Sequence, residues 1–347
     1  MNWEAIIWAV VMLVGGFVLL GKGADWFVDG AAGLAAKLRI PQLVIGLTIV
    51  AFGTSAPELA TSVISAIGGN VGIAVGNVLG SNITNILLIL GLSAIFCALP
   101  VQKDSLKIDL PVVVGSGALL ILFGAFDNEI DRWEGAIMVV LLIAYTAFLI
   151  WNALRQRKNE PTMSALNNHD VVAESAEKPE EKKGKFAAWY EKMKSYTWFL
   201  VIATVVGLGL VVGGAMIAVE GAKTIATEIG IPQKVIGLTV VAIGTSLPEL
   251  ITSVVAAKKG ETDIAVGNIV GSNIFNVLMV AGLSAVKMPL PFASEGVSFL
   301  TDGLIALGAV TMLSLFAYLP GHKIKRWHGV VMLLGFVAYY VYLFVMM

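Results

Sequence analysis

Residues 40–63 read IPQLVIGLTIVAFGTSAPELATSV, and residues 231–254 read IPQKVIGLTVVAIGTSLPELITSV. The two stretches are identical at 19 of 24 positions, at an offset of 191 residues. At the same offset, residues 73–94 (IAVGNVLGSNITNILLILGLSA) match residues 264–285 (IAVGNIVGSNIFNVLMVAGLSA) at 15 of 22 positions. The chain therefore contains two copies of one structural unit.

The composition identifies the solvent in which this unit folds. Of the 347 residues, 57% are apolar and 14% are charged, and the mean hydropathy is +0.86. A soluble domain carries about a quarter charged residues, and disordered chains have the opposite composition. The net charge of −1 gives no reason to expect nucleic acid as a partner. A single cysteine, Cys97, excludes an internal disulfide framework. The composition indicates a polytopic protein whose partner is the lipid bilayer.

A membrane helix needs about 20 mostly apolar residues, and ten such runs are present. The predicted spans lie near residues 4–30, 41–67, 71–97, 109–126, 134–154, 198–228, 233–257, 262–286, 297–319 and 327–347. Each copy of the repeat thus contains five spans, and an odd number forces the second copy to cross in the opposite sense. We expect an all-α membrane protein with two inverted-topology repeats of five helices. Inverted repeats are typical of secondary transporters, whose sites lie near the bilayer midplane.

Three regions follow from this division. The first repeat covers residues 1–155, with its repeated block at about 40–94, and the second covers 197–347, with its block at about 231–285. Residues 156–196 form a linker of mixed charge with few apolar residues, which predicts a solvated segment. If the linker is cytoplasmic, 18 basic residues lie on its side of the membrane and 3 on the other. The positive-inside rule then places both termini outside.

Each repeat carries a glutamate inside a predicted span. The surrounding sequences are Gly53-Thr54-Ser55-Ala56-Pro57-Glu58 and Gly244-Thr245-Ser246-Leu247-Pro248-Glu249. A charge at the centre of a membrane helix costs about 2.5–3.5 kcal/mol on insertion scales. Thr54 and Glu58 are spaced i and i+4, which predicts that they share a helix face. Pro57 removes the helical partner of the Gly53 carbonyl, and Pro248 does the same at Gly244.

The next span of each repeat adds a polar stripe. Its residues are spaced by four: Asn77, Ser81 and Asn85 in the first repeat, and Asn268, Ser272 and Asn276 in the second. Asn82 and Asn273 lie off these stripes and are expected to bond to backbone. Asp29 and Glu220 share the 191-residue offset near span ends and are expected to be interfacial or paired.

The intramembrane groups are carboxylate, hydroxyl, amide and freed carbonyl oxygens. Such ligands suit Ca²⁺, Na⁺ or Mg²⁺ and argue against zinc or copper. A kinked helix with its glutamate bonded to a neighbour is the simpler alternative for one copy. Its occurrence in both inverted copies favours an ion site.

The paired blocks GTSAPE…GNVLGSNITN and GTSLPE…GNIVGSNIFN resemble the two α-repeats of the sodium/calcium exchanger family, within the cation/Ca²⁺ antiporter superfamily. The resemblance implies an antiporter that exchanges Na⁺ for Ca²⁺ by alternating access, with no cofactor. It implies central ligands for Ca²⁺ and Na⁺ at Thr54, Glu58, Thr245 and Glu249. It also implies flanking sodium ligands at Ser55, Ser81, Ser246 and Ser272 and at the backbone carbonyls of Ala51 and Ala242, with Asn85 and Asn276 beside the glutamates.

The chain departs from some relatives at position 276. Asn276 stands where the potassium-dependent branch carries Asp, which puts potassium coupling in doubt. The Thr-Ser pairs are intact, whereas the proton-coupled branch usually replaces them. The linker has no room for the calcium-sensing domains of animal relatives.

Several alternatives stay open from the sequence. Exchange of H⁺ for Ca²⁺ or another divalent cation is the first, because both glutamates can titrate. An intramembrane enzyme using Glu58 and Glu249 as an acid/base pair is disfavoured, since no nucleophile, metal-binding histidine or phosphate loop lies nearby. A cation channel is a third reading. The sequence leaves the oligomeric state open, and a monomer fits it.

Overall fold

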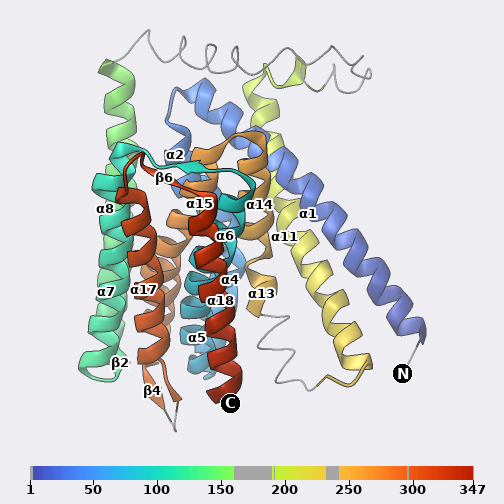
Figure 1. Cartoon of the computed structure of the whole chain (residues 1–347), viewed down its shortest axis with the longest axis vertical. Coiled ribbons are helices and arrows are strands. Elements are labelled where there is room, and N and C mark those ends of the chain that lie inside the picture. Colours follow the sequence, from blue (N-terminus) through green and yellow to red (C-terminus); the bar gives the residue numbers. More distant parts are fainter. Residues whose placement is uncertain (1–2, 160–189, 191, 232–241, 295–296, 347) are drawn as a thin grey trace.

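The computed structural model describes residues 3–159, 190, 192–231, 242–294 and 297–346. Within these residues the chain is a helical bundle with three short two-stranded β pairs (Figure 1). The architecture is that of an all-helical polytopic membrane protein, as the composition predicts.

The first repeat begins with the long helix α1 and continues through interrupted helices. Its elements are α1 (Trp3–Leu38), α2 (Gln42–Ile45), the π-helical segment η1 (Gly46–Val50), α3 (Ala51–Thr54), α4 (Ala56–Ile67), α5 (Val71–Ile83), the π-helical η2 (Thr84–Leu90), α6 (Gly91–Phe96), β1 (Leu99–Pro100), the π-helical η3 (Ser105–Asp109), α7 (Leu110–Phe126), β2 (Glu129–Ile130) and α8 (Arg132–Asn159).

The second repeat follows the same order. Its described elements are α11 (Thr197–Glu228), α13 (Ala242–Thr245), α14 (Leu247–Lys259), α15 (Thr262–Phe275), the π-helical η5 (Asn276–Ala281), α16 (Gly282–Lys287), β3 (Leu290–Pro291), β4 (Ala293–Ser294), β5 (Val297–Ser298), α17 (Leu300–Tyr318), β6 (Lys323–Ile324) and α18 (Arg326–Met346). Most of the predicted linker and residues 232–241 of the seventh predicted span lie outside the described residues.

The membrane-spanning candidates agree with most of the predicted spans. Seven continuous helices of the described chain are long and apolar enough to cross a bilayer, and the pair Gln42–Thr54 and Ala56–Ile67 is an eighth candidate bent by 47°. The first helix runs to Leu38, beyond the predicted end at residue 30. The total of ten spans stays a prediction, because the described residues supply up to eight.

The ends of the first, last and linker-flanking helices lie relative to one another as the predicted topology requires. The start of α1 and the end of α18 lie at one end of the bundle, and the end of α8 and the start of α11 lie at the other (Figure 1). The ends of α8 and α11 that the linker joins are therefore opposite the start of α1 and the end of α18.

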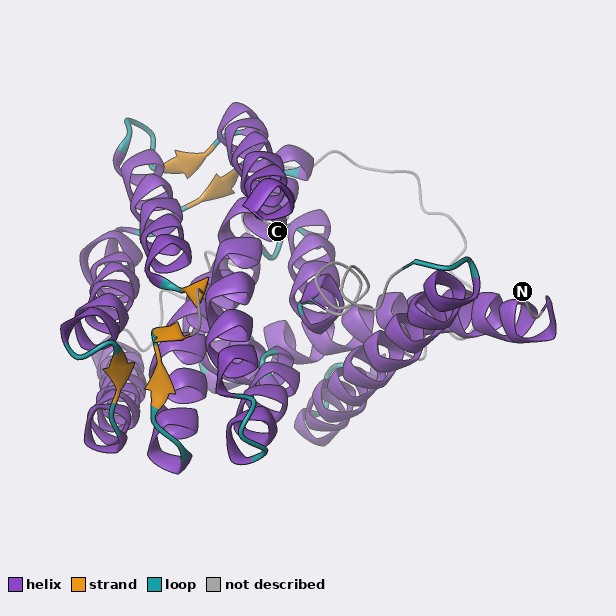
Figure 2. Ribbon diagram, turned by 90° about the horizontal axis from the view of Figure 1, so that it is seen from below, coloured by secondary structure: helices purple, strands orange, loops and turns teal. Residues whose placement is uncertain are grey.

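Helices α1 and α11 form a closely packed pair that stands at one side of the bundle (Figures 1 and 2). A Cβ on Gly16 would lie 2.7 Å from the Gly214 carbonyl oxygen, and one on Gly23 would lie 2.9 Å from that of Gly207. Later residues of α1 thus meet earlier residues of α11, so the two helices run antiparallel. Because α1 and α11 are equivalent at the 191-residue offset, their antiparallel packing is what an inverted repeat requires.

Two of the β pairs connect the repeats at opposite ends of the bundle. β1 pairs antiparallel with β6, placing Leu99 opposite Ile324, and β2 pairs with β3, placing Ile130 opposite Leu290. Leu99 and Leu290 are themselves 191 residues apart. The same short strand of each repeat therefore binds a loop of the other repeat.

Candidate functional site

The site begins at a break in the second span of the first repeat. Helix α3 ends at Thr54, Ser55 has φ −85° and ψ 7°, and α4 begins at Ala56. Pro57 lies in the first turn of α4, where its missing N–H costs no helical hydrogen bond. Ser246 has the same conformation, with φ −90° and ψ 7°, and Pro248 follows it.

The break corrects one detail of the sequence prediction. Thr54 and Glu58 were expected on one face of a continuous helix, but they lie on two segments separated by Ser55. A bend of 47° between the two segments thus interrupts the i and i+4 spacing of these residues. Pro57 has no amide hydrogen to donate to the Gly53 carbonyl, and its ring clashes with that carbonyl in a continuous helix, so the helix is interrupted just before the proline, at Ser55.

The two breaks bring the glutamates together through crossed hydrogen bonds. Ser55 Oγ donates to Glu249 Oε1 over 2.8 Å, and Ser246 Oγ donates to Glu58 Oε1 over 3.5 Å. Glu58 is 1% exposed and Glu249 is fully buried. Each repeat thus supplies a hydroxyl to the carboxylate of the other.

A second set of bonds surrounds the glutamates, and the sequence did not reveal its partners. Thr54 Oγ1 donates to Asn268 Oδ1 over 3.1 Å, and Asn268 Nδ2 donates to Ser253 Oγ over 2.8 Å. In the first repeat, Asn77 Nδ2 donates to Ser62 Oγ over 2.8 Å. Ser62 and Ser253 are repeat equivalents four residues after the glutamates, a signal that could have identified them.

The polar stripes reach the site at π-helical segments. Segment η2 includes Asn85 in its first turn, and η5 begins at Asn276. Helix α4 contacts η5, and α14 contacts η2, so each glutamate-bearing helix packs against the π-helical segment of the other repeat. π-bulges are frequent at functional sites. The off-stripe Asn82 donates from Nδ2 to the Asn273 carbonyl over 3.4 Å, and Asn273 donates to the Ile269 carbonyl, as predicted.

The structure places the predicted site residues in the interior of the bundle. Nine of the predicted side chains are at most 3% exposed: Thr54, Ser55, Glu58, Ser81, Asn85, Ser246, Glu249, Ser272 and Asn276. Ala51 is also buried, Thr245 is half-buried, and Ala242 is the first residue of α13.

Several of these buried oxygens have no hydrogen-bond partner among the described residues. They are Glu58 Oε2, Glu249 Oε2, Asn85 Oδ1, Asn276 Oδ1 and Ser272 Oγ. Leaving a buried polar atom unpaired costs about 1–3 kcal/mol, and more for a charged group. A cation coordinated by these oxygens would offset that cost, and oxygen ligands of this kind suit Na⁺ and Ca²⁺. The donor set therefore fits a bound hard cation.

The two acidic residues that share the repeat offset near span ends are paired. Asp29 forms ion pairs with Lys259 at 2.8 Å and Lys194 at 2.9 Å, and Glu220 pairs with Lys223 at 3.4 Å. These pairs confirm the expectation that Asp29 and Glu220 are not part of the intramembrane site.

Comparison with known proteins agrees with this arrangement. The family model described as "Sodium/calcium exchanger protein" matches residues 8–151 and 199–345. Sodium/calcium exchanger MaX1 of Methanosarcina acetivorans is 36% identical over 96% of this chain and 98% of its own length. The putative antiporter CaxA of Alkalimonas amylolytica is 36% identical over 97% of this chain and 98% of its own.

The fold is also similar to a solved structure. The sodium-calcium exchanger NCX_Mj, soaked with zero Na⁺ and Ca²⁺, superposes with a TM-score of 0.79 and 30% identity over 97% of this chain and 99% of that one. The similarity spans both repeats and the breaks between them. The chain is therefore a multi-pass membrane antiporter that belongs to the sodium/calcium exchanger protein family.

Proposed function

We propose that this antiporter exchanges Na⁺ for Ca²⁺ by alternating access at the paired breaks of the two repeats. The observation that carries the proposal is the crossed pair Ser55–Glu249 and Ser246–Glu58. Each carboxylate uses one oxygen for the other repeat's serine, and its second oxygen is buried without a partner among the described residues. Two such oxygens facing one site supply the two negative charges that one Ca²⁺ would cancel.

The proposed central site for Ca²⁺ consists of Thr54, Glu58, Thr245 and Glu249. Sodium ions would use the same carboxylates together with flanking ligands: the hydroxyls of Ser55, Ser81, Ser246 and Ser272 and the carbonyls of Ala51 and Ala242. Asn85 and Asn276 would complete the coordination beside the glutamates. Because the carboxylates are shared, Ca²⁺ and Na⁺ exclude one another, and exclusion of this kind couples the two fluxes.

The burial of the site supports the coupling. Two ionised carboxylates without counterions are expensive in a membrane interior. A state with neither ion bound would therefore resist crossing, whereas either the calcium-bound or the sodium-bound state would lower that cost. The transporter would move only when loaded, and this is the requirement for exchange without leak.

The proposed organisation places two inverted repeats, 1–155 and 197–347, around this site. The linker 156–196 would be cytoplasmic and both termini outside, in the plasma membrane. The charge asymmetry of the loops supports this orientation. The proposed partners are the bilayer and the transported ions, and a monomer fits the proposal.

Exchange of H⁺ for Ca²⁺ is the alternative. The oxygens of Glu58 and Glu249 that have no partner among the described residues could accept protons as well as bind a cation. Proteoliposomes containing the purified full chain distinguish the two. We expect ⁴⁵Ca²⁺ uptake when an outward Na⁺ gradient is imposed, and none with a K⁺ or H⁺ gradient alone. Uptake driven by a pH gradient without sodium would replace the proposal with the alternative.

The ligand assignment is tested in the same vesicles. Glu58→Gln and Glu249→Gln should each abolish sodium-driven uptake, because Gln keeps the volume but removes one charge. Glu134→Gln is the matched control, since Glu134 is 8% exposed and accepts a hydrogen bond from the Asp131 amide, remote from the breaks. Full uptake by either site variant would refute the assignment.

A further inference from the structure

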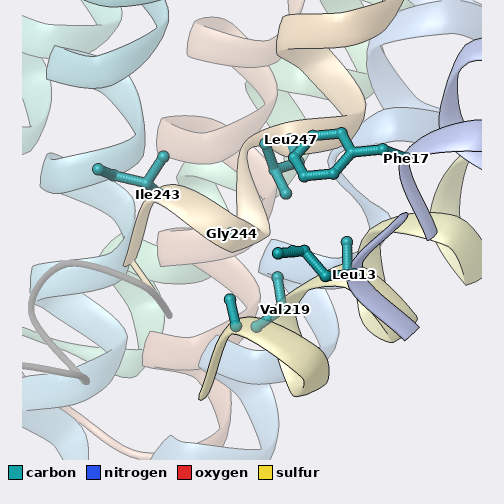
Figure 3. A pocket seen from close by; sticks show the side chains of 8 residues that line it. Leu13, Phe17, Val219, Ile243, Gly244 and Leu247 are labelled. Carbon is teal, nitrogen blue, oxygen red and sulfur yellow. The ribbon is translucent and has the colours of Figure 1, made fainter. Parts of the chain in front are cut away.

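We propose that an apolar cavity between α1, α11 and the α13–α14 break binds one acyl chain of a membrane lipid. The cavity has a volume of about 220 Å³ and lies beside Gly244, the residue before Thr245 (Figure 3). It is separate from the polar ion site. Its walls come from the helix pair on one side and from the broken helix on the other.

The chemistry of the wall selects a hydrocarbon. Among the residues that the structure describes, the lining is apolar or glycine: Leu13, Phe17, Ala218, Val219, Ala222, Ile243, Gly244 and Leu247. A buried water needs two to four polar partners, and cavities lined by aliphatic and aromatic side chains stay dry. These eight residues present no polar side chain to a water or an ion. A chain of methylene groups can pack against this wall without leaving any polar group unpaired.

The mouth of the cavity is continuous with the lipid-facing surface. Phe17 lines the cavity and is nevertheless 45% exposed. Its neighbours on α1, Val14 and Val18, are each 58% exposed, and Met216 on α11 is 66% exposed. In a membrane-spanning helix such side chains face acyl chains. A lipid tail can therefore enter sideways without crossing a polar surface.

The equivalent place in the first repeat is differently filled. At the 191-residue offset, Gly53 corresponds to Gly244 and Leu208 corresponds to Phe17. A Cβ on Gly53 would lie 2.8 Å from Leu208 Cδ2, so this leucine lies directly on the glycine. Phe17 instead stands beside an open space next to Gly244. The two ends of one pseudo-symmetric contact thus differ. Leu208 lies on Gly53, whereas the side chain on Gly244 is Val219, with a Cβ on that glycine 2.3 Å from Val219 Cγ2, and Phe17 lines the cavity beside it.

This difference gives the site a functional consequence, which rests on the proposed function. If the helix pair moves during transport so that the two repeats exchange conformations, Phe17 must approach Gly244 as Leu208 approaches Gly53. An acyl chain in the cavity would occupy the space needed for that approach. Bound lipid would therefore favour the conformation described here and slow exchange.

Photo-crosslinking tests the binding site directly. The full chain is reconstituted in vesicles of phosphatidylcholine and phosphatidylglycerol that contain a phosphatidylcholine with a diazirine on one acyl chain. After irradiation, peptide mass spectrometry should find labels concentrated at Leu13, Phe17 and Leu247. Labelling no stronger than at Val140, which is 62% exposed on α8, would overturn the proposal.

Two substitutions sharpen this test. Ala222→Leu fills the cavity and should lower its labelling severalfold, while the matched Ala136→Leu on the exposed face of α8 should leave it unchanged. If Ala222→Leu fails to give a monodisperse protein, Phe17→Ala serves in its place, and its wider mouth should raise the labelling of Leu13 and Leu247. Cavity labelling that is the same with and without the substitution would refute the site.

The transport consequence is measured separately in the same vesicles. Ala222→Leu, whose leucine takes the place of the lipid, should slow sodium-driven ⁴⁵Ca²⁺ exchange severalfold relative to Ala136→Leu. An unchanged rate would overturn the state-selective role. Labelling requires no transport, so loss of the proposed ion exchange and loss of the lipid site give different results.

Discussion

Ser55 and Glu249 stand 194 residues apart in the chain, yet the serine hydroxyl donates to the carboxylate over 2.8 Å inside the protein. The equivalent bond, from Ser246 to Glu58, measures 3.5 Å. Each repeat therefore donates the equivalent serine hydrogen bond to the glutamate of the other repeat, but the two bonds differ in length. An exact two-fold relationship would make the bonds equal, so the two contacts are not exactly symmetric in this structure.

The unequal bonds predict unequal effects of serine removal. A hydrogen bond to a charged group contributes about 1.5–3 kcal/mol, which corresponds to a roughly tenfold to hundredfold change in affinity. Ser55→Ala should raise the half-saturating Na⁺ concentration for ⁴⁵Ca²⁺ release by about this factor. Ser246→Ala should have a smaller effect, because its bond is longer. Equal shifts in the two variants, measured in proteoliposomes at fixed Ca²⁺, would contradict this reading.

Of the repeat-equivalent asparagines Asn77 and Asn268, Asn268 should contribute more to the stability of the fold. Its side chain is fully buried and joins Thr54 of one repeat to Ser253 of the other, whereas Asn77 is half-buried and joins residues of its own repeat. Asn268→Ala leaves the buried Ser253 hydroxyl without this partner, at about 1–3 kcal/mol, while Thr54 keeps its bonds to the Val50 and Ala51 carbonyls. Thermal unfolding in detergent should show a larger decrease in melting temperature for Asn268→Ala than for Asn77→Ala. The reverse order would show that the bridge contributes little.

Much of the site could be predicted because polar residues are conspicuous in a membrane span. Glu58 and Glu249 stand at matching places of a repeat, and the structure buries both together with their predicted neighbours. The prolines predicted a disturbed helix, and the break falls at Ser55, between Thr54 and Glu58. Local spacing assumes a continuous helix, and that assumption fails where a turn intervenes.

The contacts between repeats could not be predicted in the same way. The bond from Thr54 to Asn268 depends on how α15 packs against the first repeat, and no local pattern encodes that register. The close packing of α1 on α11 did leave a sequence signal. Gly16, Gly23 and Gly30 recur every seven residues and reappear 191 residues later as Gly207, Gly214 and Gly221. Small residues such as glycine allow membrane helices to approach closely. Both helices also contain other glycines that lie outside this contact, so the sequence alone did not single out these six.

A pair of glycines on α1 tests whether this contact is essential. A Cβ on Gly23 would lie 2.7 Å from both Leu210 Cβ and the Val211 amide nitrogen, whereas one on Gly21 would meet no described atom within 4 Å. Gly23→Ala must push the backbones apart and should lower the melting temperature and the exchange rate. Gly21→Ala should be neutral or stabilising by up to about 1 kcal/mol, because alanine favours the helix. If both variants behave alike, close α1–α11 packing is not required.

The ion cluster at the linker end of the bundle gives the last test. Lys259 on α14 binds both Asp25 and Asp29 on α1, and Lys194, just before α11, binds Asp29. The cluster therefore ties the helix pair to the broken helix, and its members are only partly exposed. Lys259→Met should lower the melting temperature at low salt, and the difference from the unsubstituted chain should shrink at high salt because screening weakens ion pairs.

A double-mutant cycle separates the contact from other effects of the substitutions. Asp29→Asn and Lys259→Met should show a coupling energy within about 0.5–3 kcal/mol, the range for residues in one network. Lys258→Met is the matched control, since its ammonium lies 4.6 Å from the Phe96 ring rather than beside Asp29. Exposed ion pairs contribute about 0–1 kcal/mol to stability. Additive effects of Asp29→Asn and Lys259→Met would therefore show that this cluster stabilises the fold no more than an exposed pair does. Measurable coupling would instead show that α1 and α14 are held together at this end of the bundle, a contact that any relative movement of the helix pair must break.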